Sequence, residues 1–232
     1  VLLRRIYFDL IGLPPTPKQL AVFREHASRN RADAIRDVVD ELLASPHYGE
    51  RWARHWLDLA RYTDKTASWL NSTASAWRYR DWIVQAFNRD LPYNVFVKQQ
   101  LANDLMTGSD PEDNAALGYL GLSPTYWKEL QLPPEVIKTT VADEWEERMD
   151  AVGRTFLGLT LACARCHDHK FEPVTQADYY AIAGVFASVR ISDRPTISDE
   201  MWAPVAKART EVAGFEKEIA SLKKKKQDTK LP

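Results

Sequence analysis

Apolar residues recur at helical spacing along most of the chain. The first such face is formed by Leu3, Ile6, Tyr7 and Leu10. Gly12 can end this helix, because glycine readily adopts the left-handed conformation that closes a helix. No stretch shows the alternation of apolar and polar positions that is typical of a half-buried strand. The pattern therefore predicts an all-α fold made of many helices in an irregular arrangement.

Start and stop signals divide the chain into further helices. Residues 16–19 resemble a capping box with proline at the first helical position, Ser45-Pro46 interrupts the pattern, and Thr175 can cap a later helix. Loop signals concentrate in residues 106–134. The expected helices lie around residues 35–42, 49–62, 82–87, 97–101, 135–159 and 179–186.

The predicted helix over residues 49–62 carries a large aromatic face. Helical spacing places Trp52, His55, Trp56 and Leu59 on one side. We therefore expect the His55 ring to point inward. A buried histidine bonded to a backbone carbonyl would have the same pattern.

The C-terminal segment differs from the rest. Apolar residues alternate at intervals of three and four, as in a short coiled-coil seam, at Val205, Ala208, Val212, Phe215, Ile219 and Leu222. This helix could pack on its own domain, pair with a later helix, or form an oligomer contact. We expect a helical domain over residues 1–190, a linker over 191–200 and an amphipathic helix over 201–232.

Composition excludes two classes of partner for this segment. The chain of 232 residues has 31 basic and 32 acidic side chains, which is not the positive charge expected of a nucleic-acid binder. No apolar run approaches the roughly 20 residues of a membrane span. The chain begins at Val1 inside a predicted helix, so we expect it to be part of a longer polypeptide.

The segment Cys163-Ala164-Arg165-Cys166-His167 spells the attachment signature of c-type haem. Two cysteines at this spacing can each add to one vinyl group of the macrocycle. The histidine that follows can supply the proximal imidazole to the iron. The motif thus predicts one covalent haem c, with His167 as an iron ligand.

Other readings of this cysteine pair stay open at this point. A zinc site could use Cys163, Cys166, His167 and His169, although a tetrahedron is awkward within seven residues. A redox or structural disulfide between the two cysteines is the simplest alternative. The surrounding βαβ pattern of a thioredoxin-like site is missing.

Several blocks along the chain resemble one family, the planctomycete-type cytochrome c-like domains of uncharacterised function. The last block joins residues 153–160 to the motif and its continuation through Pro173. Lys65-Thr66-Ala67 and residues 122–132 do not match a diagnostic block. The earlier matching blocks cover residues 4–16, 45–52, 55–62, 77–82 and 87–93.

This resemblance implies a c-type haem domain within a larger exported protein, with further domains of the same polypeptide around it. Electron transfer in the periplasm, or another location outside the cytoplasm, is the function we expect first. A haem-dependent oxidoreductase with an open iron site, similar to a peroxidase, is the alternative. A binding module stabilised by haem is a third possibility. The redox partner or substrate is not predicted.

Candidate residues around the haem follow from chemistry. His55 could be the distal iron ligand or line an open site, with His47, Met106 and Met149 as the next candidates. His169 could act as an acid or base near a substrate, or tune the proximal imidazole. Arg61 could pair with a haem propionate, because a guanidinium matches a carboxylate, and structural ion pairing is the competing interpretation.

Overall fold

The protein is described by a computed structural model that covers residues 1–64, 76–121, 133–189, 192 and 194–228. Every regular element within these residues is a helix, which confirms the all-α prediction. The α-helices are α1 (Leu2–Ile11), α2 (Pro17–Arg29), α3 (Arg31–Leu43), α4 (Pro46–Leu59), α5 (Ala76–Asn88), α6 (Tyr93–Ala102), α7 (Gly118–Gly121), α8 (Pro134–Val152), α9 (Gln176–Ser188) and α10 (Asp199–Asp228). Short turns are η2 (Asn103–Leu105), η3 (Pro111–Leu117), η4 (Gly153–Leu157) and η5 (Ala162–Arg165).

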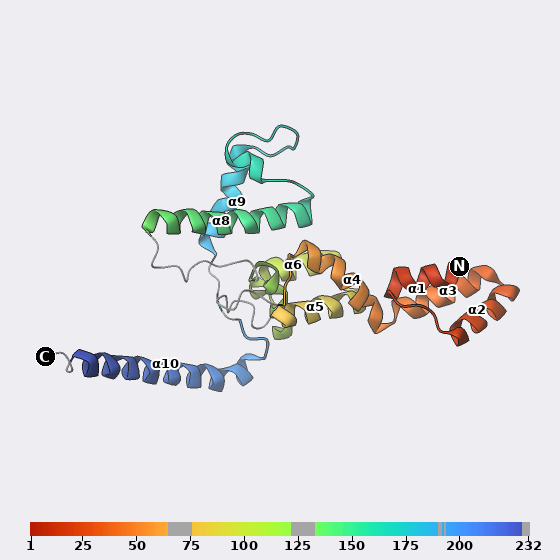
Figure 1. Ribbon diagram of the computed structural model, residues 1–232, viewed down its shortest axis with the longest axis horizontal. Coiled ribbons are helices and arrows are strands. Elements are labelled where there is room, and N and C mark those ends of the chain that lie inside the picture. The colour runs from red at the N-terminus through yellow and green to blue at the C-terminus, as the bar shows by residue number, and fades with distance from the viewer. Residues whose placement is uncertain (65–75, 122–132, 190–191, 193, 229–232) are drawn as a thin grey trace.

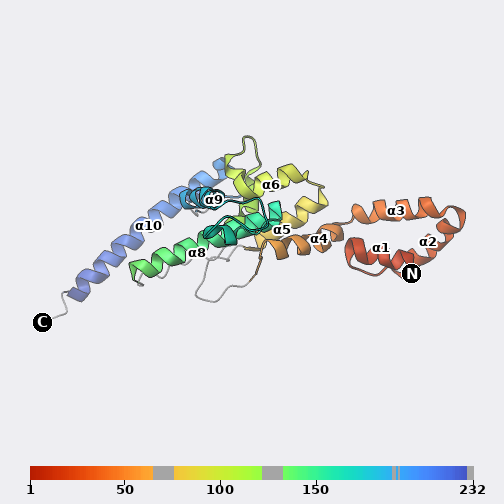
Figure 2. The ribbon, with the colours of Figure 1, turned by 90° about the horizontal axis from the view of Figure 1, so that it is seen from above.

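The helices form an elongated molecule (Figure 1). Helices α1 to α3 occupy one end, and α4 to α6 lie in the middle. Helices α8 and α9 pack on each other beside the middle part, and α10 extends toward the opposite end in both views (Figure 2).

The N-terminal helices have a small core of their own. Leu3, Tyr7 and Leu42 are buried there. Gly12 ends α1 in the left-handed conformation with φ of 73°, as the sequence predicts. The predicted capping box is also present, because the Thr16 side chain accepts a hydrogen bond from the Gln19 N–H and the Gln19 side chain bonds back to the Thr16 backbone.

Helices α4 and α5 lie unusually close together around Gly49. A Cβ atom at this position would lie 2.3 Å from the Val84 carbonyl oxygen. The Gly49 N–H instead donates to the Asn88 side-chain oxygen at 2.7 Å. The close approach buries Tyr79, Ile83 and their neighbours in the central core.

This geometry corrects the predicted inner face of α4. The buried side is the one that carries Gly49 and Ala53, whereas His55 is exposed and Trp52 is 37% exposed. The prediction that the His55 ring points inward is therefore wrong. The small residues Gly49 and Ala53 determine which side of α4 is buried, because they let α5 approach closely. The positions of the large aromatic residues in the sequence do not reveal this contact.

A buried carboxylate ties η3 to the central helices. The Asp113 side chain accepts hydrogen bonds from Trp82 Nε1 at 2.7 Å, Arg89 at 2.9 Å and Gln99 Nε2 at 2.7 Å. Burial alone would raise the pKa of Asp113. The three donors and the charge of Arg89 outweigh it and hold the pKa below its usual value.

Helix α8 covers most of the helix that the sequence predicts over residues 135–159. It ends at Val152 and continues as the π-helical turn η4 to Leu157. Helix α9 begins after Thr175, whose side chain accepts a hydrogen bond from the Asp178 N–H as the sequence predicts. Met149, Leu161 and Phe186 are among the residues buried between α8, α9 and the intervening segment.

Part of the predicted loop region 106–134 is ordered into η3 and α7, while residues 122–132 and 65–67 lie outside the described residues. The predicted linker 191–200 runs along the body where it is described. Arg194 pairs with Asp104 at 2.8 Å, and the Pro195 carbonyl accepts from Asn114 Nδ2 at 2.8 Å. Beyond it, the apolar seam of α10 stays exposed, at 54% for Val212 and 63% for Phe215.

Candidate functional site

The cysteine motif lies on a turn that is packed against the end of α8. The chain leaves α8 through η4 and folds back so that Leu161 covers Gly153. A Cβ atom on Gly153 would lie 2.8 Å from the Leu161 Cγ, so the glycine makes this return possible. Leu161 and Ala164 are buried, at 2% and 0% exposure, and they anchor η5 in the core.

The three residues with reactive groups lie on the outer side of this turn. Cys163 and Cys166 are both exposed and carry free thiols, and His167 is exposed beside them. The His167 Nδ1 lies 2.8 Å from the Asp168 carbonyl oxygen. A carbonyl can only accept, so Nδ1 carries the proton and Nε2 keeps its lone pair for a metal ion.

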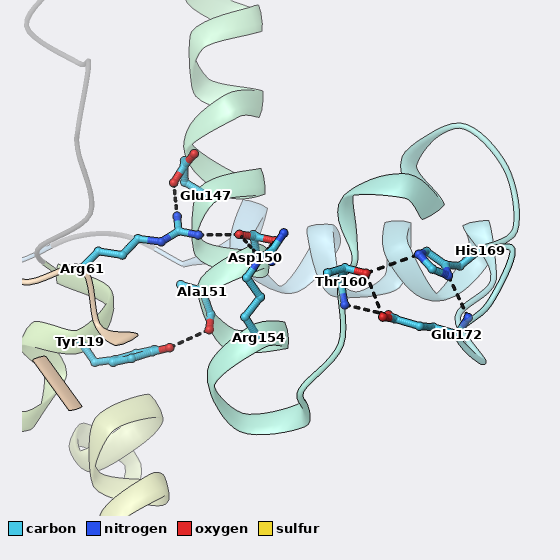
Figure 3. Close-up of polar contacts among 9 residues, drawn as sticks. All are labelled: Arg61, Tyr119, Glu147, Asp150, Ala151, Arg154, Thr160, His169 and Glu172. Atoms are coloured by element: carbon cyan, nitrogen blue, oxygen red, sulfur yellow. Dashed lines mark hydrogen bonds and ion pairs between the residues drawn. The ribbon is translucent and has the colours of Figure 1, made fainter. Parts of the chain in front are cut away.

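The loop after the motif is closed by a network of side chains (Figure 3). The Glu172 carboxylate accepts from the Thr160 N–H at 2.7 Å and from the Thr160 hydroxyl at 2.9 Å. His169 Nδ1 accepts from the backbone N–H groups of Phe171 at 3.2 Å and Glu172 at 2.8 Å. The His169 Nε2–H then points to the Thr160 hydroxyl at 3.4 Å.

This network gives His169 a structural task. Its Nδ1 lone pair is already engaged by the loop backbone, so this nitrogen is not available as a base or a zinc ligand in the described arrangement. No three His, Cys, Asp or Glu side chains among the described residues gather into a group that could hold a metal ion. The structure therefore does not support the four-ligand zinc alternative.

Two further contacts fix the motif on its neighbouring helices. The Arg165 side chain pairs with Glu146 of α8 and lies 3.9 Å from Asp143, and the charge of Glu146 raises the pKa of this guanidinium. The Arg165 carbonyl accepts from Gln176 Nε2 and from the Tyr180 hydroxyl of α9, each at 3.2 Å. The motif is thus attached to both α8 and α9.

Exposed apolar side chains lie on α9 and on the loop that follows the motif. Helix α9 is apolar around most of its circumference. One side packs on α8, but Tyr180 and Val185 remain 56% and 59% exposed, and Phe171 in the loop is 83% exposed. Tyr180 also contacts the Arg165 carbonyl, so its ring lies beside the motif, whereas Val185 lies about 140° away around the helix. An apolar helix face normally requires a cover.

The Arg61 side chain forms ion pairs with α8. It follows α4 in a left-handed conformation with φ of 56°, and its guanidinium pairs with Glu147 and Asp150 of α8 (Figure 3). Asp150 also accepts from Arg154. Of the two sequence interpretations of Arg61, structural ion pairing is the one that the structure shows, and a propionate would have to displace two carboxylates.

The distal-ligand candidates His55, His47 and Met106 lie on or beside other elements than the motif, and Met149 lies in the core. The exposed His55 ring lies against Trp52, at 5.5 Å between ring centroids, on α4. His47 pairs with Glu50 on the same helix, and Met106 follows η2. Met149 is 1% exposed inside the core beneath the motif, as a core methionine would be.

Polar residues at and after the end of α4 line a separate cavity of about 810 Å³. Asp58, Tyr62 and Asp64 are among its lining residues, together with Arg80. Burial and a hydrogen bond to Asp64 raise the pKa of Tyr62 to about 12. The phenol therefore remains a proton donor at neutral pH.

Residues 1–191 match the PSCyt2 family, which is described as "Protein of unknown function (DUF1549)". The chain belongs to the PSCyt2 family. The resemblance predicted from the sequence is thereby confirmed at the level of the family, whose name refers to a planctomycete cytochrome-like domain. No curated protein and no solved structure matches the chain. None of the helices within the described residues is long and apolar enough to cross a membrane.

Sequence reasoning found the reactive residues of this PSCyt2 domain but missed those that hold them. Thr160 and Glu172 lie twelve positions apart, and nothing in their spacing predicts a contact. Arg165 occupies a variable position of the motif and gave no signal of its pairing with α8. The sequence pointed to His169, but in the role of an acid or base instead of a loop acceptor.

Proposed function

We propose that this PSCyt2 domain binds one haem c covalently through Cys163 and Cys166, and that it transfers electrons. The observation that carries the proposal is the presence of two free, exposed thiols and an exposed imidazole on one anchored turn. When bound, haem c supplies one-electron chemistry at its iron.

The residues present fit such a group. Both thiols are available for thioether formation, and the Nδ1 contact of His167 leaves Nε2 for the iron. The exposed Tyr180 ring, whose hydroxyl bonds to the Arg165 carbonyl, supplies apolar contact area for a macrocycle near the thiols.

Attachment requires only addition chemistry from the chain. Each thiol S–H adds across one vinyl C=C bond, so that a carbon–sulfur bond forms and the thiol hydrogen moves to the neighbouring vinyl carbon. Neither step consumes an oxidant. The thiols must be reduced at that moment, and in most bacteria this assembly takes place outside the cytoplasm, so the proposal includes a periplasmic or otherwise exported location.

A haem-dependent enzyme is the second candidate. It is favoured by the positions of His55 and Met149, since the first is exposed on α4 and the second is enclosed in the core. If neither reaches the iron, the sixth position is open to a substrate or to a ligand from another domain. An open position gives high-spin iron, whereas two axial ligands give low-spin iron.

Expression together with a cytochrome c maturation system tests the proposal. Intact-mass measurement should show an adduct of one haem, and the pyridine spectrum should be that of haem with two thioether bonds. The Cys163→Ala/Cys166→Ala double variant should lose the adduct. A wild-type chain that matures without gaining a haem mass would contradict the proposal.

A matched variant separates attachment from ligation. His167→Ala should change the optical spectrum of the attached haem, while His169→Asn should leave the iron spectrum close to wild type. The spectrum of the untreated protein then decides between electron transfer with two axial ligands and an open iron site. His55→Ala should leave that spectrum unchanged if the exposed position of His55 persists in the haem-loaded protein.

A further inference from the structure

A separate cavity lies among the middle helices. It has a volume of about 490 Å³ and is formed by the start of α4, the end of α5, the connection between α5 and α6, and the start of α6. This volume falls in the range of roughly 300–1,000 Å³ that is typical of small-molecule sites. The described lining residues are Tyr48, Trp56, Ala86, Phe87, Asp90, Leu91, Pro92, Tyr93 and Phe96.

The aromatic rings of this cavity are arranged at steep angles. Trp56 and Phe87 meet the Phe96 ring at interplanar angles of 70° and 60°, with centroid distances of 4.7 and 5.9 Å. Phe96 itself is 6% exposed and stacks on Trp82, which is not among the lining residues. Phe96 thus forms the inner wall, and two rings stand against it.

A buried hydrogen bond holds the Trp56 ring of this cavity in place. The Trp56 Nε1 donates to the Gln100 side-chain oxygen at 2.8 Å, and Gln100 is fully buried. Tyr48 is half-buried at the α4 end of the cavity, while Tyr93 is 60% exposed at its rim. The Trp56 ring is therefore held in place before any ligand binds.

One acidic residue is among the residues that line this cavity. Among the described lining residues, Asp90 alone carries a formal charge. It has φ of 49°, a left-handed conformation that its position after α5 imposes. The turn is held by the Leu91 N–H, which donates to the Ala86 carbonyl at 3.0 Å.

We propose that this cavity binds an alkylated ammonium group. Aromatic ring faces attract cations through their quadrupoles, and the Asp90 carboxylate adds a full opposite charge. A permanently charged, weakly hydrated ammonium loses less on leaving water than a metal ion or a primary amine would. The lining residues include no cation that would compete with it. The site lies apart from Cys163 and Cys166, so the proposal does not depend on haem attachment.

Calorimetric titration with choline tests this proposal, with 3,3-dimethylbutan-1-ol as its uncharged isostere. Choline should bind, and the neutral compound should bind roughly tenfold more weakly because it lacks the charge. Equal affinity for the two compounds, or no binding of choline, would overturn the proposal.

Variants of the full chain locate the site. Asp90→Asn keeps a residue that tolerates the left-handed conformation and should weaken choline binding roughly tenfold. Tyr93→Ala removes a rim ring and should also weaken it. Asp40→Asn on α3 and the Cys163→Ala/Cys166→Ala variant should bind choline as wild type does. Choline binding that survives both Asp90→Asn and Tyr93→Ala unchanged would refute the assignment, provided that circular dichroism shows both variants folded.

Discussion

At the scale of single residues, Asp113 shows how one buried charge organises the central helices. Its carboxylate accepts from Trp82 of α5, from Arg89 directly after α5, and from Gln99 of α6. Removing the carboxylate charge weakens all three hydrogen bonds at once, and the loss exceeds that of a surface pair. The same set makes the stability depend on pH.

We predict that Asp113→Asn lowers the free energy of unfolding by about 3 kcal/mol at neutral pH. The folded pKa of Asp113 lies below its usual value, so its contribution is fully present above the unfolded value of 3.8 and is lost as the pH falls through the folded pKa. The difference between wild type and variant should therefore shrink below about pH 4. Urea unfolding measured across pH gives this profile.

The exposed neighbour Glu112 provides the control for this experiment. Glu112→Gln should change the free energy of unfolding by no more than about 0.5 kcal/mol at any pH. An Asp113→Asn loss that stays constant down to strongly acidic pH would show that the carboxylate is not the origin of the effect.

At the scale of elements, the loop from Thr160 to Gln176 is a unit that keeps the motif in place. The Thr160 N–H donates to the Glu172 carboxylate, and His169 accepts from the Glu172 N–H inside the loop. Arg165 pairs with Glu146 and so connects the loop to α8. A turn that carries two covalent attachment points benefits from such preorganisation, because the thiols keep a constant separation.

We predict that Glu172→Ala loosens this loop without unfolding the domain. The Thr160 N–H and hydroxyl would both lose their acceptor, at an expected loss of about 1–3 kcal/mol. Amide hydrogen exchange in residues 160–176 should accelerate, while exchange in α5 should stay slow. Glu135→Ala, whose side chain is 82% exposed at the far end of α8, is the matched control and should change neither. Unchanged exchange in the loop of Glu172→Ala would show that this hydrogen-bond network does not hold the loop in place.

At the scale of the whole molecule, α10 stands apart from the rest. It extends from the body in both views (Figures 1 and 2), and its apolar seam is exposed from Val205 to Leu222. Most helices gain their stability from packing an apolar face, and the seam of α10 is unpacked among the described residues. The segment before it is held on the body through Arg194 and Pro195.

We predict that deletion of residues 199–232 leaves the thermal midpoint of the remaining chain within about 2 °C of the full chain. The reason is that α10 buries little apolar surface against the other helices. Differential scanning calorimetry measures the midpoint, and circular dichroism should show the loss of helical signal. A large decrease in the midpoint would mean that α10 supports the body.

The sequence by itself determined the helical class, the capping signals at Thr16 and Thr175, and the reactive residues Cys163, Cys166 and His167. These features depend only on residues that are close together in the sequence, so the sequence alone is sufficient to predict them. The family also follows from short blocks whose order is visible in the sequence.

Only the tertiary structure decided which side of α4 is buried, and with it the exposed position of His55. Gly49 and Ala53 allow the close approach of α5, and that contact lies between segments distant in the chain. The same holds for the pairing of Arg61 with α8. Such interactions depend on which helices meet, and helical periodicity contains no information about the partner.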